Sequence, residues 1–235
     1  MTTKKPEKIF EDETKCLFLA EQKDNLIQQF KLNELFDKKK KRKGPDTALL
    51  RNEISSYLFQ YLETFQIPNH FVKQFSDYEM VVKQSVSIPI VAHAYNFVTQ
   101  NLSKRFDLKF GSPLSFPIFE YYYKKDDTKH QINETHVFSL GILSAEEYKL
   151  INRLVSKTNA VIKSLCERRN LLLSDIMLEL GRHQNQIMIV GEMSPLNCYF
   201  WNVTDDGKPH KNYFDYGEDN AIELFTELRD RLQHK

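Results

Sequence analysis

The chain has 235 residues, enough for one large domain or for two small lobes that share a core. Charged residues make up 28% and hydrophobic residues 41%, and 33 Lys and Arg nearly balance 32 Asp and Glu to leave a net charge of +1. This composition is ordinary for a soluble globular protein and argues against a globally basic nucleic-acid binder. The low content of Gly (7) and Pro (8) excludes collagen-like and low-complexity chains.

Membrane and secretion signals are absent from the sequence as given. No apolar run approaches the length of a membrane span, and the first residues, 1–6, lack the apolar core of a signal peptide. The three cysteines, Cys16, Cys166 and Cys198, are scattered and form no CxxC pair, which argues against a disulfide framework or a zinc knuckle. We therefore expect a cytoplasmic protein with reduced thiols and no membrane partner.

The first half of the chain predicts short strands around one helix. Leu26–Phe30 and Glu79–Lys83 have the composition of short strands. A basic run, Lys38–Lys43, precedes Gly44-Pro45 and is typical of a solvated loop. Apolar residues then recur at helical spacing and predict an amphipathic helix that ends before Ile67-Pro68; they are Leu50, Ile54, Tyr57, Leu58, Tyr61 and Leu62.

The rest of the chain predicts further strands and two more helices. Val81–Ile90 and Ile118–Tyr123 are rich in β-branched or aromatic residues and are predicted as strands. The capping box Ser144–Glu147 opens a long helix. Two strands, Leu171–Leu180 and Ile187–Val190, follow around a polar turn, and Ala221–Leu232 is predicted as a closing helix. This order favours an α+β fold over a regular βαβ alternation.

Few residue patterns indicate chemistry by themselves. Asp175 and Glu179 would share one face of a strand, with Met177 between them, and such a carboxylate pair can bridge Mg²⁺ to nucleotide phosphates. Asp126-Asp127 suits either a cation site or a charged turn. The run Lys38–Lys43 suits either phosphate or nucleic-acid binding or a solvated loop, and it lacks interleaved aromatic residues. Five dispersed histidines lack metal-ligand spacing, and they are His70, His93, His130, His136 and His183.

Several segments together resemble the SAICAR synthetase family, the ATP-dependent ligases that join aspartate to a carboxy-aminoimidazole ribotide in purine synthesis. Their order and spacing agree over nearly the whole chain. The segments are residues 67–71 (Ile-Pro-Asn-His-Phe), 76–83, 102–105 (Leu-Ser-Lys-Arg), 117–124, 132–136, 175–181 and 194–201. The resemblance implies an α+β fold with an N-terminal antiparallel β lobe, residues 1–84, and a larger α+β lobe, residues 85–235, with ATP in the cleft between them.

The sequence departs from the family pattern mainly at glycine, charge and hydroxyl positions. Asp12-Glu13-Thr14-Lys15 stands where the family has Gly-Lys-Thr-Lys, which places two carboxylates where phosphates should pass. Gly191-Glu192 stands where the family has Asp-Glu, so one expected metal ligand is missing. Further positions differ in the same way, namely Leu32-Asn33, Tyr95, Gln100-Asn101, Met177, Leu196, Tyr199 and Tyr213-Phe214-Asp215.

These departures predict a catalytically impaired or inactive homologue of purine-biosynthesis ancestry, with a binding or regulatory role. The alternative is an active ATP-dependent carboxylate–amine ligase, either SAICAR synthetase itself or one with an altered substrate, for which tyrosines in place of Arg would suit a flatter, less charged ligand. A third hypothesis is an interaction module whose handle is Lys38–Lys43.

The resemblance also implies which residues would bind ligands. If Mg·ATP binds, the nucleotide is expected near Lys15, Lys83 and Glu179, with Glu179 and Glu192 toward the metal. An anionic substrate is expected at Ser103, Lys104 and Arg105, although Lys104 and Arg105 also suit a solvated helix end. The expected partners are a small anionic or nucleotide ligand and either a second copy of the chain or another purine enzyme.

Overall fold

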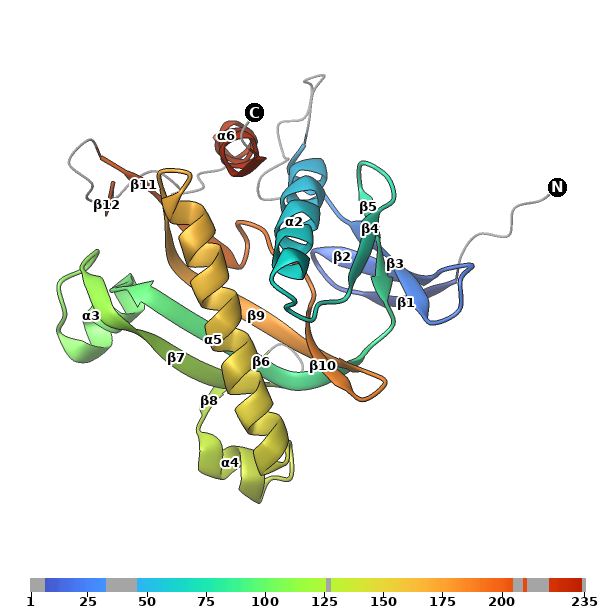
Figure 1. Ribbon diagram of the computed structural model, residues 1–235, viewed down its shortest axis with the longest axis horizontal. Coiled ribbons are helices and arrows are strands. Elements are labelled where there is room, and N and C mark those ends of the chain that lie inside the picture. The colour runs from blue at the N-terminus through green and yellow to red at the C-terminus, as the bar shows by residue number, and fades with distance from the viewer. Residues whose placement is uncertain (1–6, 33–45, 126–127, 205–208, 211–219, 234–235) are drawn as a thin grey trace.

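The computed structural model describes residues 7–32, 46–125, 128–204, 209–210 and 220–233. Its strands form two sheets, and every paired strand is antiparallel to its neighbours (Figure 1). The first sheet has five strands in the order β1-β2-β3-β5-β4. Its members are β1 (Lys8–Glu11), β2 (Lys15–Leu19), β3 (Asn25–Phe30), β4 (Phe71–Gln74) and β5 (Glu79–Lys83).

The second sheet has seven strands in the order β12-β11-β9-β6-β7-β8, and β10 pairs with β9 beside this path. The long strands β6 and β9 form its centre, with Val91 opposite Glu179 and Tyr95 opposite Asp175. The strands of this sheet are β6 (Val86–Phe97), β7 (Pro113–Lys125), β8 (Thr128–Ile132), β9 (Leu171–His183), β10 (Gln186–Val190), β11 (Cys198–Val203) and β12 (Pro209–His210).

Helices cover one side of this framework. The longest, α5 (Ala145–Glu167), lies across the seven-stranded sheet against β9 and β6, and α2 (Thr47–Thr64) packs against β3, β4 and β5 of the first sheet and against α5 (Figure 1). Near one end of α2 lies the C-terminal helix, α6 (Ala221–Gln233). The short helices are α3 (Gln100–Phe106) and α4 (Glu134–Ser139). None of the described helices is both long and apolar enough to cross a membrane.

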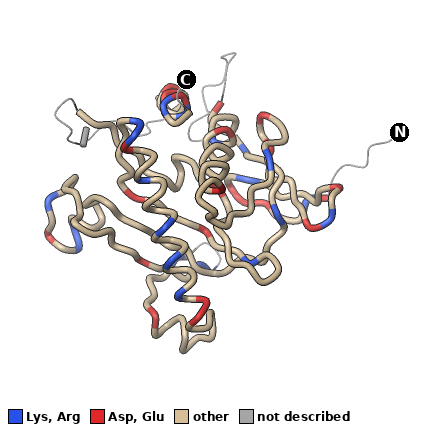
Figure 2. Tube along the Cα trace, in the orientation of Figure 1, with Lys and Arg blue, Asp and Glu red and all other residues tan. Residues whose placement is uncertain are grey.

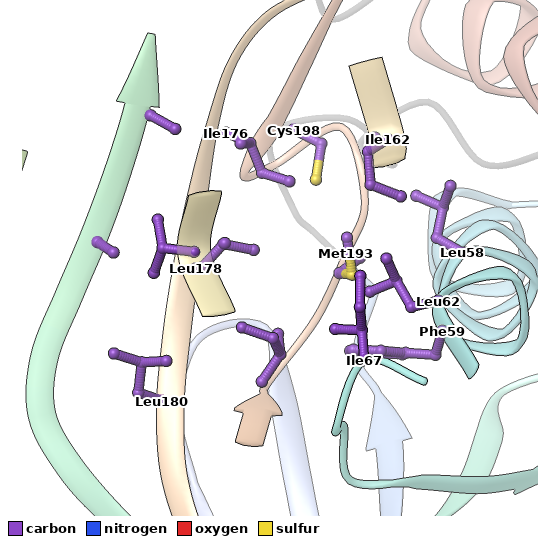
Figure 3. Close-up of a cluster of buried hydrophobic side chains, with 14 of the residues drawn as sticks. Leu58, Phe59, Leu62, Ile67, Ile162, Ile176, Leu178, Leu180, Met193 and Cys198 are labelled. Atoms are coloured by element: carbon purple, nitrogen blue, oxygen red, sulfur yellow. The ribbon is translucent and has the colours of Figure 1, made fainter. Parts of the chain in front are cut away.

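One buried cluster joins the two sheets. It contains Leu26 and Val82 of the five-stranded sheet together with Leu178 and Leu180 of the seven-stranded sheet. In Figure 3, Leu58 and Leu62 of α2 point toward Met193, and Ile176 and Cys198 approach from the opposite side. The expected division of the chain between residues 84 and 85 stays a prediction, since residues on both sides of it share this core.

The structure confirms most of the predicted elements. The strand Glu79–Lys83 and the helix that starts after Ser144 have the expected bounds, and the helix containing Leu50 and Leu62 is α2. The prediction of one strand over Val81–Ile90 was wrong, because β5 ends at Lys83 and β6 begins at Val86 in the other sheet. A continuous run of strand-forming residues does not reveal where the chain passes from one sheet to another.

Lys and Arg alternate with Asp and Glu along the described trace in the view of Figure 2. The three thiols, Cys16, Cys166 and Cys198, are unpaired and buried. The basic run Lys38–Lys43 lies outside the described residues, as do Asp126-Asp127 and Tyr213-Phe214-Asp215.

Candidate functional site

Two adjoining cavities lie where the sheets face each other. Their volumes are about 350 Å³ and about 630 Å³, and the larger falls in the range of small-molecule sites. Both are lined by Asp12, Lys15, Val91, Lys124 and Glu179, so these residues form the boundary between the two cavities. Strands of both sheets thus supply the lining, and an occupant would contact both sheets at once.

An ion pair between Lys15 and Glu179 links the sheets at this boundary. Lys15 Nζ lies 3.2 Å from Glu179 Oε2, and Lys124 Nζ lies 3.5 Å from Glu179 Oε1. Burial opposes both charges, but the neighbouring carboxylates raise the pKa of Lys15, and the two ammonium groups lower the pKa of Glu179. Lys15 and Glu179 are therefore both charged at neutral pH, in a place where a phosphate or a cation would meet them.

The alternation of β9 explains the position of Glu179. Met177 and Glu179 point into the smaller cavity, while Ile176, Leu178 and Leu180 point into the core. The sequence predicted this shared face for Asp175, Met177 and Glu179. Asp175 lines neither cavity, and its carboxylate lies beside His93.

Glu192 is held by a buried arginine. Arg51 of α2, which is fully buried, donates from Nε to Glu192 Oε1 and from a terminal nitrogen to Glu192 Oε2, both at 2.6 Å. The Ser194 hydroxyl also donates to Oε1. Arg51 further donates to the Thr14 carbonyl at 3.2 Å, which ties the β1–β2 turn to α2. Glu192 lines the smaller cavity with both of its oxygens already paired.

The larger cavity contains a buried histidine, His70, which the sequence analysis named only as one of five dispersed histidines. His70 is 3% exposed, and its Nε2 atom has no hydrogen-bond partner within the described part of the chain. Burial, and secondarily the charge of Lys15, lower the pKa of His70 to about 3, so the ring is neutral. A buried polar atom without a partner is costly, which makes His70 a candidate contact for a bound ligand.

Lys83 lines the same cavity from the end of β5. Its Nζ atom donates to the Asn69 carbonyl at 3.1 Å. Lys15, Lys83 and Glu179, the three residues expected near a nucleotide, thus all line the larger cavity, and Glu192 lines the smaller one. Whether they bind a nucleotide stays a prediction.

The residues expected at an anionic substrate, Ser103–Arg105, lie on α3 and line neither cavity. Arg105 is paired with Glu120, with a shortest separation of 2.8 Å. Glu120 also accepts hydrogen bonds from the hydroxyls of Tyr122, at 2.5 Å, and Tyr95, at 3.3 Å. Burial opposes ionisation of Glu120, yet Arg105 and Tyr122 hold its pKa below the usual value. The charge of Arg105 is therefore balanced inside the protein.

A second polar group lies on the same face of the seven-stranded sheet. His93 Nε2 lies 2.8 Å from Asp175 Oδ2, and the His93 ring stacks on Tyr95 with 3.9 Å between ring centres. Ser174 donates to the other Asp175 oxygen at 2.7 Å. Aromatic rings and one carboxylate–imidazole pair thus occupy the part of the sheet where the family resemblance led us to expect arginine.

The acidic residues fit Mg²⁺ only as part of a nucleotide complex. No group of three or more His, Cys, Asp or Glu able to hold a metal ion exists among the described residues. Mg²⁺ is commonly held by one or two carboxylates together with substrate phosphates and water. Glu179 and Glu192 both line the smaller cavity, and each is already engaged by the protein: Glu179 pairs with Lys15 and Lys124, and Glu192 pairs with Arg51 and accepts from Ser194.

Two antiparallel sheets, the helices packed on them and a cavity lined by strands of both sheets define an α+β protein with a candidate small-molecule site. Comparison with known proteins makes the class more specific: the family model of SAICAR synthetase matches residues 8–217. The chain therefore belongs to the SAICAR synthetase family, and its ancestry is in purine biosynthesis.

Similar proteins match over nearly their whole length. The phosphoribosylaminoimidazole-succinocarboxamide synthase of Pelodictyon phaeoclathratiforme is 32% identical over 231 residues, covering 97% of this chain and 98% of the relative. The crystal structure of the Ehrlichia chaffeensis synthase is 31% identical with a TM-score of 0.84, covering 97% of this chain and 98% of that chain. A SAICAR synthetase solved in complex with ADP is 29% identical with a TM-score of 0.83, covering 96% and 97%.

Proposed function

We propose that this protein binds Mg·ATP in the larger cavity. The observation that carries the proposal is the convergence of Lys15, Lys83 and Glu179 on one cavity of about 630 Å³ with the Nε2 atom of His70, which has no partner among the residues that the structure describes. Ammonium groups pair with phosphate oxygens, and Glu179 is placed to share a Mg²⁺ ion with them. The ADP complex of a 29% identical family member supports a nucleotide as the occupant.

We further propose that the protein is impaired in the family's ligation reaction and has a binding or regulatory role. In that reaction, ATP phosphorylates the imidazole carboxylate and the aspartate amine then displaces phosphate. A ribotide phosphate needs cations, but Arg105 is already paired with Glu120, and Tyr95 donates to the same carboxylate. A dianion there would compete with the Glu120 carboxylate for Arg105 and would be repelled by that carboxylate.

An active ligase with an altered substrate is the second candidate. The His93–Tyr95 stack and the nearby Asp175 carboxylate favour it, because aromatic faces and a hydrogen-bond acceptor suit a flat, weakly charged acceptor molecule. Pairing with another purine enzyme, or with a second copy of the chain, belongs to the regulatory proposal and is tested separately. A cytoplasmic location is part of this proposal, and the unpaired cysteines and the biosynthetic family support it.

The first test is calorimetric titration of Mg·ATP into the purified protein. We expect saturable binding that weakens about tenfold or more in Lys15→Met and Glu179→Gln, because each change removes one charged contact. Glu21→Gln is the matched control, since Glu21 is exposed and lines neither cavity. Unchanged affinity in both cavity variants, or no saturation at millimolar ATP, would overturn the nucleotide proposal.

The second test measures ligation directly. The protein is incubated with Mg·ATP, aspartate and the carboxy-aminoimidazole ribotide, and product is followed by mass spectrometry. A catalytically impaired protein forms no aspartate adduct while a known synthetase does so in parallel. Adduct formation at the rate of that synthetase would contradict the impairment. Phosphate release with a different carboxylate acceptor would instead support the second candidate.

A further inference from the structure

The turn between β1 and β2 gathers several hydrogen-bond donors around one oxygen. Asp12 Oδ1 accepts from the backbone N–H of Thr14 at 2.7 Å, from that of Lys15 at 2.8 Å, and from the Thr14 hydroxyl at 2.9 Å. The second carboxylate oxygen, Oδ2, lies 3.9 Å from Lys15 Nζ. Consecutive backbone N–H groups with a hydroxyl and an ammonium form the kind of concavity that binds phosphate oxygens.

This turn belongs to the cavity boundary. Asp12 and Lys15 line both cavities, and Thr14 lines the smaller one. The larger cavity independently indicates a ligand, because the buried Nε2 atom of His70 has no partner among the described residues. The donors of the turn therefore sit at a ligand cavity while being directed at a carboxylate of the chain itself.

The local charges reinforce this arrangement. Lys15 faces two carboxylates, Glu179 at 3.2 Å and Asp12 at 3.9 Å, and both compete with a ligand phosphate for its ammonium group. A polyphosphate approaching Lys15 would meet the Asp12 carboxylate at the same donors. Like charges a few ångströms apart in a partly buried site repel strongly.

We infer that Asp12 is a specificity-determining residue whose carboxylate takes the place of a ligand phosphate at the Thr14 and Lys15 amides. Because of the Asp12 carboxylate, the cavity binds an uncharged nucleoside in preference to a nucleoside that carries a polyphosphate. The inference rests on the proposed nucleotide site and adds to it the charge class of ligand that the site prefers. The Asp12 carboxylate competes with a ligand phosphate for the same N–H donors. When the carboxylate is displaced, these donors are available to phosphate.

Two substitutions separate the charge of Asp12 from its hydrogen bonds. Asp12→Asn keeps the acceptor oxygen and removes the charge, and Asp12→Gly removes both and frees the two N–H groups. We expect Mg·ATP to bind several-fold more tightly to Asp12→Asn and about tenfold or more tightly to Asp12→Gly, whereas adenosine affinity stays within about twofold. Glu21→Gln, which removes the same charge from an exposed position in the turn between β2 and β3, should leave all affinities unchanged.

Inorganic tripolyphosphate is the second probe, since it carries the charge without the base. The inference requires that it bind Asp12→Gly more tightly than the unmodified protein. Equal affinities of all three proteins for both Mg·ATP and tripolyphosphate would overturn the inference while leaving a nucleotide site intact if ATP binds. Tripolyphosphate binding by Asp12→Gly, without ATP or adenosine binding by any variant, would overturn the proposed nucleotide function and the nucleoside preference, and would keep only the assignment of the Asp12 carboxylate to a phosphate position. Near-ultraviolet circular dichroism checks that each variant is folded.

Discussion

Arg51 is the largest fully buried side chain among the described residues, and its position is set by partners far apart in sequence. It pairs through two hydrogen bonds of 2.6 Å with Glu192 and also donates to the carbonyls of Thr14 and Lys31. One residue of α2 thereby fixes the β1–β2 turn and the segment after β10 relative to each other. The geometry of the cavity boundary depends on this contact.

Arg51→Met should destabilise the protein by about 3–5 kcal/mol, because it leaves the Glu192 carboxylate buried without its cation. Urea unfolding followed by circular dichroism measures the change. The double variant Arg51→Met/Glu192→Leu should recover most of the loss, since neither charge then remains. Arg229→Met is the control: its partners Glu53 and Asp230 are 29% and 40% exposed, so it should cost about 1 kcal/mol or less. Equal losses in Arg51→Met and Arg229→Met would contradict this account.

Gly191 stands where the family has an aspartate, and this difference affects more than the number of metal ligands. Its φ angle is +85°, a conformation that strains residues with a Cβ atom. A Cβ atom at this position would also lie 2.4 Å from Glu179 Oε2. An aspartate here would therefore both strain the backbone and displace the carboxylate that pairs with Lys15.

At the scale of elements, α5 is the clearest case in which local sequence decides the structure. The Ser144 side chain accepts from the Glu147 N–H, and the Glu147 side chain accepts from the Ser144 N–H, which closes the predicted capping box. The helix then buries one apolar stripe, including Ile151, Val155 and Ile162, against the seven-stranded sheet.

Ser144→Ala should cost about 1 kcal/mol of stability, because the N–H of Glu147 loses its capping acceptor. The free energy of unfolding in urea gives the value. Ser156→Ala is the matched control, since Ser156 is exposed within the same helix and alanine is the better helix former there. A loss at Ser156 equal to that at Ser144 would argue that the cap contributes nothing.

Across the whole molecule, the core shared by the two sheets determines whether they unfold together. Buried residues of β3 and β5 belong to the same cluster as those of β9 and α5. The five-stranded sheet also depends on α2, whose Leu58 and Leu62 are buried in that cluster (Figure 3). Neither sheet buries its apolar face without the other.

We therefore expect the chain to unfold in one cooperative transition. Trp201, the one tryptophan of the sequence, packs against Phe97 and Phe110 in the seven-stranded sheet and reports on it by fluorescence. Far-ultraviolet circular dichroism reports on both sheets and the helices. The two signals should change at the same urea concentration. A circular-dichroism change that precedes the fluorescence change would show that the first lobe, residues 1–84, unfolds independently.

Sequence by itself determined the features that depend on neighbours in the chain. Helical spacing and caps gave α2, α5 and α6, strand composition gave β3 and β5, and the alternation along β9 placed Met177 and Glu179 on one face. The family was identified from short segments, and the comparisons confirmed it. These features follow from local backbone preferences and from periodicity.

Only the tertiary structure decided which side chains meet and how their charges are balanced. Lys15 and Glu179 are 164 positions apart, and Arg51 and Glu192 are 141 apart. The pairing of Arg105 with Glu120, and the lack of a partner for His70 Nε2 among the described residues, depend on segments from different strands and helices. Burial and pairing energies arise from contacts between distant segments, so no local pattern predicts whether a charged residue is free to bind a ligand or is already engaged by the protein.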